Sequence, residues 1–579
     1  MDHYIGIDVG TGSARACIIN SVGDIVGEGS ENIDRQDPEH GFHEQSTTNI
    51  WQSVCISVKD ALKENNTDPG SIRGIGFDAT CSLAVFHYET DEPVSVTYPD
   101  FKSEQNVILW LDQRPIEETM QINNTADPDL LRYVGSKMSP EMEICKVLWL
   151  KNHMPQEMFD KCSFYDLADA LVHIAAGTED KSFQIADRKS GSMPVGIDGS
   201  VKGWKENFLR AIGLGDLAQD GYKRIGGVNK SGEYRSAGEL AGHLCEKAAS
   251  DLGLPPGIPI GSGVIDAYAG WIGTVGAKVD LGPGHMIPDV PGNDEAQALT
   301  RLAAVAGTST CHLALSPDQI FVDRIWGPFH DVVLPGYCIT EGGQTATGEL
   351  LRHVVENHPA YGQAKYSMGP GESIYDYLDG HLKDMMRGQN APFISYLARH
   401  FFFYGDLYGN RSPVADPSMA GSVIGLTSDN SVDSLAIYYY ATLEFIALQT
   451  KHIVETMSQA GHRLKSIFMS GSQCKNEILV ALIASACNRP VVIPKYVDSA
   501  VCHGSAMMGA KAASATEDGR GEKLWDIMNR MSKPGRSVMP TQDARQKSLL
   551  EAKYRIFLEQ CNTQQKYRKS IDEVVNNWA

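Results

Sequence analysis

The sequence contains 56 glycines but no Gly-Lys dipeptide. A Walker-type phosphate-binding loop needs that dipeptide, because its lysine reaches the phosphates, so this class of nucleotide site is excluded. No Gly-x-Gly-x-x-Gly motif follows an apolar segment either, which excludes the common dinucleotide-binding fingerprint. If a nucleotide binds, it is therefore held by another kind of phosphate-binding element.

Cysteine is present but never grouped. The 12 cysteines are scattered singly, without a Cys-x-x-Cys pair or a Cys/His cluster at zinc-binding spacing. This distribution argues against a structural zinc and against a dithiol redox centre. We interpret the cysteines as reduced thiols, which predicts a cytoplasmic protein.

The chain also lacks long apolar runs and an excess of basic residues. It has no run of about 18 apolar residues, and residues 1–8, MDHYIGID, do not have the basic and apolar character of a signal peptide. Lys+Arg 51 against Asp+Glu 72 gives a net charge of −21. Such a charge repels nucleic acid and anionic membranes, so we expect neither as a partner. A small phosphate-bearing ligand needs only a local pocket of N–H groups.

At 579 residues the chain is too long for one hydrophobic core, and two or three domains are expected. Apolar segments around Gly-rich turns open the chain and predict strands and one helix in an α/β layer, at 4–10, 14–20, 24–30, 49–65 (the helix) and 72–80. Residues 140–175 are predicted as two helices with a loop between them.

A second half begins near residue 299 with the same pattern. Residues 302–316 predict two strands around a Gly turn, 431–461 a long helix or helix pair, and 464–494 a strand, turn, helix and strand. Residues 276–298 are rich in Gly, Pro and Asp, as in a linker or surface insertion. The predicted units are an N-terminal domain, a linker, a C-terminal domain and a helical tail packed on the surface, at 1–275, 276–298, 299–520 and 521–579.

Two hairpin turns combine glycine with hydroxyl residues. Residues 8–13 read DVGTGS, and residues 306–310 read AGTST, each between two apolar segments. Glycine lets backbone N–H groups approach a phosphate, and the hydroxyls add donors. Either turn alone is typical of an ordinary hairpin. Their recurrence at the start of both halves favours one polyphosphate held between them, with Asp8 placed to hold a metal-bound water.

An ordered set of motifs resembles the FGGY carbohydrate kinases along nearly the whole chain. The motifs are DVGTGS at 8–13, WLDQR at 110–114, GVIDAYAG at 263–270, AGTST at 306–310, EGGQTATG at 341–348 and SGSQCKNEIL at 470–479. The resemblance implies two actin- or hexokinase-like (ribonuclease H-like) α/β domains that flank a central cleft. GFDATCS at 76–82 and YDLADAL at 165–171 most resemble the ribulokinase-like branch of that family.

The resemblance also implies roles for single residues, with ATP and Mg²⁺ as cofactors. Asp266 matches the general base that takes the proton of the attacking sugar hydroxyl, and Asp8 and Asp266 are expected near the metal. The expected ATP-binding residues are Thr11, Gly12, Ser13, Arg15, Gly307, Thr308, Ser309, Gly348, Gly471, Ser472 and Asn476. The expected sugar-binding residues are Asp78, Cys81, Trp110, Asp112, Lys189, Asp266 and Glu341.

These expectations describe a kinase that transfers the γ-phosphate of ATP to a ketopentose, with D-ribulose as the first candidate. An L-ribulose kinase and a kinase for a pentitol such as ribitol are alternatives within the enzyme class. A non-catalytic sugar sensor and an actin-like or chaperone-type ATPase are alternatives outside it. The expected partners are the sugar and ATP, and a homodimer is left open.

Overall fold

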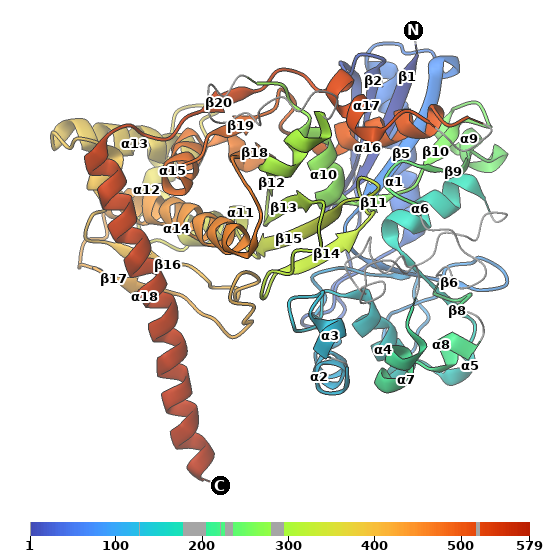
Figure 1. Ribbon diagram of the computed structural model, residues 1–579, viewed down its shortest axis with the longest axis horizontal. Helices are drawn as coiled ribbons and strands as arrows, with labels where there is room; N and C mark the ends of the chain where they lie inside the picture. Colours follow the sequence, from blue (N-terminus) through green and yellow to red (C-terminus); the bar gives the residue numbers. More distant parts are fainter. Residues whose placement is uncertain are drawn as a thin grey trace.

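The computed structural model describes residues 2–126, 128–177, 204–219, 222–225, 235–279, 294–516 and 521–578. Two large sheets form separate halves of the molecule, each surrounded by helices (Figure 1). The first sheet has the order β3-β2-β1-β5-β10-β9, with β11 also paired to β5. Its strands are β1 (His3–Val9), β2 (Ser13–Asn20), β3 (Ile25–Asn32), β5 (Ile72–Ala79), β9 (Leu240–His243), β10 (Pro259–Gly261) and β11 (Val264–Ile265).

The second sheet has the order β14-β15-β13-β12-β18-β19-β20. Its strands are β12 (Arg301–Ala306), β13 (Thr310–Ser316), β14 (Trp326–His330), β15 (Cys338–Gln344), β18 (Ser466–Ser470), β19 (Val491–Ile493) and β20 (Arg536–Val538). β1 pairs antiparallel with β2 and parallel with β5, and β12 pairs antiparallel with β13 and parallel with β18. The two halves therefore repeat one α/β pattern, which confirms the expected fold class.

Two smaller sheets extend the halves. The first is β4-β7-β6-β8 and the second is β16-β17. Their strands are β4 (Glu44–Gln45), β6 (Leu83–His87), β7 (Val107–Ile108), β8 (Cys162–Asp166), β16 (Phe402–Tyr404) and β17 (Ser422–Ile424). The helices of the first half are α1 (Thr47–Glu64), α2 (Ile116–Thr125), α3 (Pro128–Leu131), α4 (Glu143–His153), α5 (Gln156–Phe159), α6 (Leu167–Ala176), α7 (Glu206–Ile212), α8 (Asp216–Gln219), α9 (Glu246–Leu252) and α10 (Asp266–Val275). Those that follow are α11 (Gly348–Glu356), α12 (Tyr361–Ser367), α13 (Ile374–Gly388), α14 (Val432–Ala460), α15 (Glu477–Cys487), α16 (Ala500–Ala513), α17 (Leu524–Met531) and α18 (Ala544–Val575).

Helices α10 and α16 form a layer between the two large sheets. α16 packs on β1 so closely that a Cβ on Gly6 would lie 1.9 Å from the carbonyl oxygen of Cys502. On its other side α16 meets α10, where a Cβ on Gly504 would lie 2.0 Å from the carbonyl oxygen of Ala269. Only glycine permits such an approach between backbones. A helix late in the sequence therefore covers the first sheet and joins the two halves.

Several predicted elements differ in detail from the structure. The segment 140–175 holds a strand, β8, between its helices, because residues 162–166 pair with β6. The region 431–461 is one helix, α14, which Ser431 caps and Gly461 ends with a φ of +126°. The tail beyond residue 520 is not only a surface helix: α17 buries Trp525 and Met528 in the core between the sheets. Most of the predicted linker lies outside the described residues.

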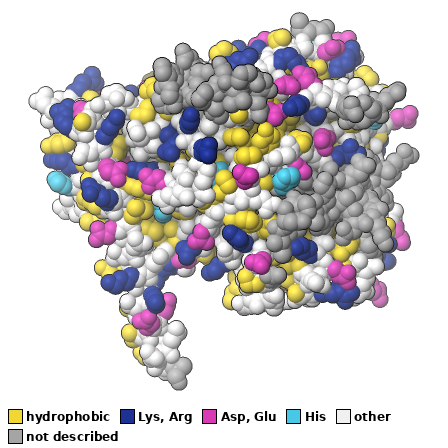
Figure 2. Space-filling view, in the orientation of Figure 1, with side chains coloured by type: hydrophobic (Ala, Val, Ile, Leu, Met, Phe, Trp, Pro, Cys, Tyr) yellow, Lys and Arg dark blue, Asp and Glu magenta, His cyan; other side chains and the backbone are white. Residues whose placement is uncertain are grey.

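The surface carries charges of both signs, and the C-terminal helix extends beyond the body of the molecule (Figures 1 and 2). On the face shown in Figure 2, acidic and basic side chains of the described residues lie interspersed. The C-terminal part of α18 projects from the body as a rod, and residues 569–578, at its end and just beyond it, are exposed (Figures 1 and 2). Within the described ranges, no helix combines the length and apolar character needed to cross a membrane.

Candidate active site

A cleft of about 430 Å³ lies between the two halves and takes its lining from both. Most of the predicted site residues meet there. The predicted residues that line it are Asp8, Thr11, Gly12, Ser13, Arg15, Cys81, Trp110, Asp266, Gly307, Thr308, Ser309, Glu341, Gly471 and Ser472. The fold therefore brings together residues from segments that are far apart in the sequence.

Three aspartates gather at one edge of the first sheet. Asp8 lies near the end of β1 and pairs in register with Asp78 of the parallel strand β5. Asp78 in turn pairs with Val264 of β11, two residues before Asp266, the first residue of α10. Because carboxyl ends of parallel strands meet at the same edge, these side chains converge at the end of the sheet where α/β proteins bind ligands.

The three carboxyl groups differ in their electrostatic settings. Burial, together with the charge of Asp8, raises the pKa of Asp266 from its usual 3.8 to about 7. Burial and Asp8 also raise the pKa of Asp78 well above its usual range, and Ser505 donates a hydrogen bond to this carboxyl group. Asp8 forms an ion pair with Arg15, which lies directly opposite on β2. Asp8 is therefore charge-compensated, whereas Asp266 is poised to exchange a proton near neutral pH.

Asp78 does not line the cleft. Its side chain is fully buried between β5 and α16, with one oxygen bonded to Ser505 and the other without a hydrogen-bond partner among the described residues. Its effect on the site is therefore electrostatic and works through Asp8 and Asp266, because its side chain is not among those that line the cleft.

The two glycine and hydroxyl turns face the cleft, as their positions between strands require. The first turn is held by Trp110, whose indole N–H donates to the hydroxyl of Thr11 at 3.0 Å. The second is held by the amide of Thr347, which donates to the carbonyl of Thr308 at 2.9 Å. A Cβ added at Gly12 or Gly307 would meet no atom within 4 Å, so both turns leave open space on their inner side.

This donor set fits a polyphosphate with a divalent cation. Backbone N–H groups and hydroxyls of the two turns are suitable partners for phosphate oxygens, and carboxylates such as Asp8 and Asp266 are the hard oxygen ligands that Mg²⁺ prefers. The open space beside Gly12 and Gly307 leaves room for such a group to approach the backbone.

The residues expected around the adenosine lie beside the second turn. Gly471 has a φ of +89°, and a Cβ there would lie 2.2 Å from the carbonyl oxygen of Ala306, so only glycine suits this position. Gly348 begins α11 and donates to the carbonyl of Gly307 at 3.2 Å. Asn476 caps α15 by accepting from the amide of Leu479 at 2.7 Å, and it donates to the hydroxyl of Tyr439. Gly348 and Asn476 lie outside the cleft lining.

At the other end of the cleft are Cys81, Trp110 and Glu341, together with residues that sequence reasoning missed. Arg411, Glu141 and Trp326 are the main additions. Arg411 lies 3.2 Å from Glu341 and 3.6 Å from Glu141, and its guanidinium lies 4.2 Å from the centre of the Trp326 ring. The sequence offers only one local signal for Arg411, its place in the Gly-Asn-Arg-Ser-Pro stretch at 409–413. A charged residue in such a turn is usually solvated.

Asp112 was predicted to bind the sugar, and the structure corrects this. The side chain of Asp112 is fully buried and does not line the cleft. Arg114 holds both of its oxygens, at 2.9 and 2.8 Å, and the amide of His43 donates to one of them at 2.7 Å. Arg114 also bonds the buried Glu44 at 2.8 Å. Asp112 therefore belongs to a structural ion-pair network.

Lys189 lies outside the described residues.

A second acidic cluster lies behind Cys81. Cys81, Glu143 and Asp166 offer ligand atoms within 4.8 Å of one another. Burial and the neighbouring Glu143 raise the pKa of Asp166 well above its usual range.

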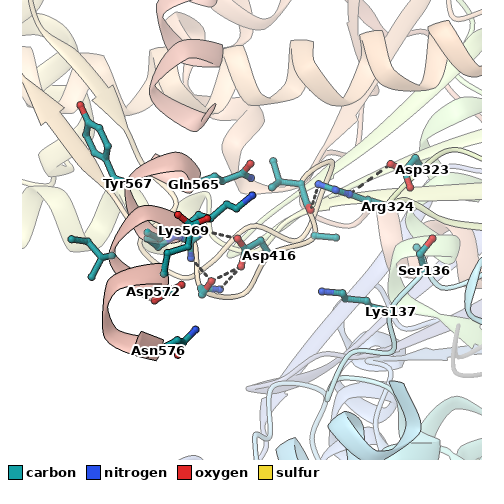
Figure 3. Close-up of a pocket in the computed structure, with 17 residues that line it drawn as sticks. Ser136, Lys137, Asp323, Arg324, Asp416, Gln565, Tyr567, Lys569, Asp572 and Asn576 are labelled. Carbon is teal, nitrogen blue, oxygen red and sulfur yellow. Dashed lines mark hydrogen bonds and ion pairs between the residues drawn. The ribbon is translucent and has the colours of Figure 1, made fainter. Parts of the chain in front are cut away.

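A larger pocket of about 1150 Å³ lies elsewhere, between the end of α18 and loops of both halves (Figure 3). Lys137, Arg324, Lys569 and Asp572 are among its lining residues. None of the predicted site residues lines this pocket, and it lacks the glycine turns of the cleft. The smaller cleft, which Asp266 and both turns line, makes this a two-domain α/β protein with a candidate active site between its domains.

Comparison with known proteins agrees with this class. The N-terminal and C-terminal domains of the FGGY family of carbohydrate kinases match residues 3–273 and 302–513. A D-ribulokinase of Saccharomyces cerevisiae is 45% identical over 514 residues, which cover 88% of this chain and 72% of that protein. A human FGGY carbohydrate kinase domain-containing protein is 36% identical over 98% of this chain and 97% of its own length.

Solved structures show the same fold at lower identity. A xylulose kinase of Rhodospirillum rubrum is 18% identical, with a TM-score of 0.72 over 98% of this chain and 99% of that chain. A glycerol kinase of Plasmodium falciparum, solved with ADP, is 15% identical, with a TM-score of 0.70 over 97% and 98%. The chain belongs to the FGGY family of carbohydrate kinases. It is accordingly a sugar kinase that uses ATP.

Proposed function

We propose that this kinase transfers the γ-phosphoryl group of ATP to the C5 hydroxyl of a ketopentose, with D-ribulose as substrate and D-ribulose 5-phosphate as product. The observation that carries the proposal is that Asp266 and both glycine and hydroxyl turns line one cleft. A base, a sugar site and phosphate donors are the parts that phosphoryl transfer requires.

In the proposed reaction Asp266 accepts the proton of the sugar hydroxyl. The hydroxyl oxygen forms a bond to the γ-phosphorus, the bond from that phosphorus to the β–γ bridging oxygen breaks, and ADP leaves. A base with a pKa of about 7 suits this step, because about half of it is ionised at pH 7 and it still binds a proton readily.

The phosphate side of the site is assigned to the two turns. We propose that Thr11, Gly12 and Ser13 face the γ-phosphate from one half, while Gly307, Thr308 and Ser309 hold the phosphate chain from the other. Asp8 and Asp266 would hold Mg²⁺, which supplies positive charge to the phosphate oxygens when bound. Arg15 adds a further positive charge beside Asp8.

Support for D-ribulose comes from the identity with the yeast D-ribulokinase and from the charge of the cleft. Asp266, Glu341 and Glu141 make the sugar end acidic, so a sugar acid is disfavoured against a neutral polyol. L-Ribulose and ribitol share the terminal hydroxyl, but L-ribulose is the mirror image of D-ribulose, inverted at C3 and C4, and ribitol has a hydroxyl in place of the C2 carbonyl. An unpaired buried polar group costs about 1 to 3 kcal/mol, so we expect discrimination of roughly 5- to 150-fold per misplaced hydroxyl.

A coupled ADP-release assay over D-ribulose, L-ribulose, ribitol, D-xylulose and glycerol tests the proposal. We expect D-ribulose to have the highest kcat/KM, and phosphorus NMR of the product should place the phosphate on C5. A higher kcat/KM for D-xylulose or glycerol would refute the substrate assignment. ADP release without any sugar would instead favour an ATPase that acts on another partner.

A further inference from the structure

Arg411 joins carboxylates of the two halves at the sugar end of the cleft. It lies in the loop between β16 and β17, and only 12% of its side chain is exposed. Its Nη2 lies 3.2 Å from Oε1 of Glu341, on β15 of the second half. The same nitrogen lies 3.6 Å from Oε2 of Glu141, which precedes α4 in the first half. One guanidinium thus spans the cleft between the halves.

The surroundings of Arg411 are shaped to its side chain. The guanidinium lies over the ring of Trp326, with 4.2 Å from its carbon to the ring centre. Gly343 follows Glu341 by two residues on β15, so both positions face the same side of the strand. A Cβ on Gly343 would lie 2.7 Å from Cδ of Arg411. The strand therefore presents a carboxylate and, beside it, the space that the arginine stem fills.

Arg411 is one of two basic side chains among the described residues that line the cleft. Among the described residues of the lining, Arg15 and Arg411 are the only Lys or Arg side chains, and Arg15 is paired with Asp8. Burial raises the pKa of Glu341, and Arg411 opposes that rise. Cys311, Glu141, Tyr268 and Asp266 are the other titratable groups that interact with Glu341. Arg411 thereby favours the carboxylate form, which accepts hydrogen bonds from sugar hydroxyls.

We propose that Arg411 is a positioning residue of the sugar site, which orients Glu341 and Glu141 so that a bound sugar is held by carboxylates of both halves. This inference rests on the proposed function, since it needs a polyol in the cleft. Arg411 acts through the two glutamates, and its removal should weaken sugar binding while the phosphate turns stay intact.

The first test replaces Arg411 by lysine and by glutamine. Lysine keeps the charge but not the planar guanidinium that lies over the Trp326 ring, and glutamine removes the charge. We expect the KM for the sugar to rise about 10-fold in Arg411→Lys and about 100-fold in Arg411→Gln, with the KM for ATP within about twofold and kcat within about threefold of wild type. This pattern is that of lost binding energy which the ground state and the transition state share.

The second test measures how sugar binding depends on pH, because the loss of a merely structural residue would not change that dependence. Calorimetry gives the Kd for D-ribulose without ATP as a function of pH. Loss of Arg411 raises the pKa of Glu341, so in Arg411→Gln this carboxylate becomes protonated at a higher pH than in wild type. As pH is lowered, sugar binding by Arg411→Gln should therefore begin to weaken at a higher pH than sugar binding by wild type. An unchanged pH profile together with an unchanged sugar KM would overturn the inference.

Arg324→Gln is the matched control. Arg324 donates to the carbonyl of Val414 at 3.1 Å, in the same loop as Arg411, but it lies in the larger pocket outside the cleft (Figure 3). Its loss disturbs the loop without touching the sugar site, so the sugar KM should stay unchanged. Equal effects of both substitutions on sugar KM would show that Arg411 only holds the loop, and would overturn the inference.

A further variant keeps the inference testable if Arg411→Gln does not fold. Gly343→Ala pushes the arginine stem aside but leaves its charge, and we expect it to raise the sugar KM as well. If wild type phosphorylates no ketopentose or pentitol, the proposed function fails and this inference fails with it. If wild type is active and the variants at 411 and 343 match it, only this inference fails.

Discussion

The surroundings of Asp266 raise its pKa and so make its carboxylate a stronger base. Its burial and the nearby charge of Asp8 both disfavour the ionised form, and the amide of Ala267 donates to its Oδ1 at 2.7 Å. Because the pKa lies near 7, this group is ionised in a large fraction of molecules at neutral pH and is still basic enough to take a proton. An exposed aspartate with its usual pKa of 3.8 would be a far weaker base.

The first prediction concerns Asp266→Asn. Loss of the base should lower kcat by about 10² to 10⁴, while the Kd for the sugar changes little. In wild type, kcat/KM should fall about tenfold per pH unit below pH 7, because the protonated group cannot accept the hydroxyl proton. Steady-state kinetics of wild type and variant across pH 5.5 to 9 check both statements. A variant with wild-type kcat would contradict the role.

Stability supplies an independent control for the same variant. The folded-state pKa is raised above the unfolded value, so the protonated group stabilises the fold, and this contribution is lost as pH rises through about 7. At pH 8 the ionised Asp266 destabilises the fold. Asp266→Asn should therefore have a higher free energy of unfolding than wild type at pH 8, by up to about 4 kcal/mol, and the difference should shrink towards pH 4, as denaturant titration at the two pH values would measure.

Asp112 shows the opposite case, a carboxylate used for structure. Arg114 and the amide of His43 satisfy it fully in a buried setting. The second prediction is that Asp112→Ala lowers the free energy of unfolding by about 3 to 5 kcal/mol, because Arg114 then keeps a buried charge without its main partner. Denaturant titration measures this loss. The sugar KM of the folded fraction should match wild type. A rise in the sugar KM without a change in the ATP KM would show that Asp112 contributes to sugar binding.

At the scale of elements, the decisive contact is that of α16 with its two neighbours. Small residues let this helix lie between the first sheet and α10, so that the two halves share one central layer. Gly6 on β1 and Gly504 on α16 are the positions where the backbones come closest. The packing of both halves therefore depends on a helix that lies late in the sequence, at residues 500–513.

The third prediction tests this packing with two glycine-to-alanine changes. A Cβ at Gly504 would lie 2.0 Å from the carbonyl oxygen of Ala269, so Gly504→Ala forces two helices apart and should destabilise the protein by at least 2 kcal/mol. Gly380→Ala is the control, since Gly380 lies inside α13 with no atom within 4 Å of the added Cβ. It should be neutral or stabilise by about 0.5 to 1 kcal/mol. Thermal unfolding of both variants decides.

At the scale of the whole molecule, the candidate site is divided between two bodies. One turn and Asp266 belong to the first half, while the second turn, Glu341 and Arg411 belong to the second. A ligand that contacts both halves favours the conformation in which they are closest. Closure would also exclude water that would otherwise hydrolyse ATP.

The fourth prediction is that sugar and a non-hydrolysable ATP analogue together reduce the radius of gyration in solution scattering. Either ligand alone should have a smaller effect, because each leaves part of the contact between the halves unmade. Asp266→Asn should still close, since its sugar affinity is expected to persist. An unchanged radius under saturating concentrations of both ligands would contradict a closing cleft.

The repeated α/β pattern and the two turns with their glycine and hydroxyl residues could be predicted from the amino-acid sequence. These are local properties: alternation and apolar runs specify strands, and turn chemistry depends on neighbouring residues. The contiguous GVIDAYAG motif also pointed to Asp266 through its family resemblance, and Asp266 lines the cleft. The strand β8 was missed, since a short apolar segment between helices has no period that distinguishes it from a loop.

The pairing of charged side chains could not be predicted from the sequence and follows from how the folded chain packs. Asp112 and Glu341 are both acidic residues in predicted motifs, yet one is bound to Arg114 in the core and the other faces the cleft with Arg411. Arg411 and Glu141 come from opposite halves of the chain and meet because α10 and α16 hold those halves together. The role of a charged group depends on its burial and partners, and both are set by contacts between residues distant in sequence.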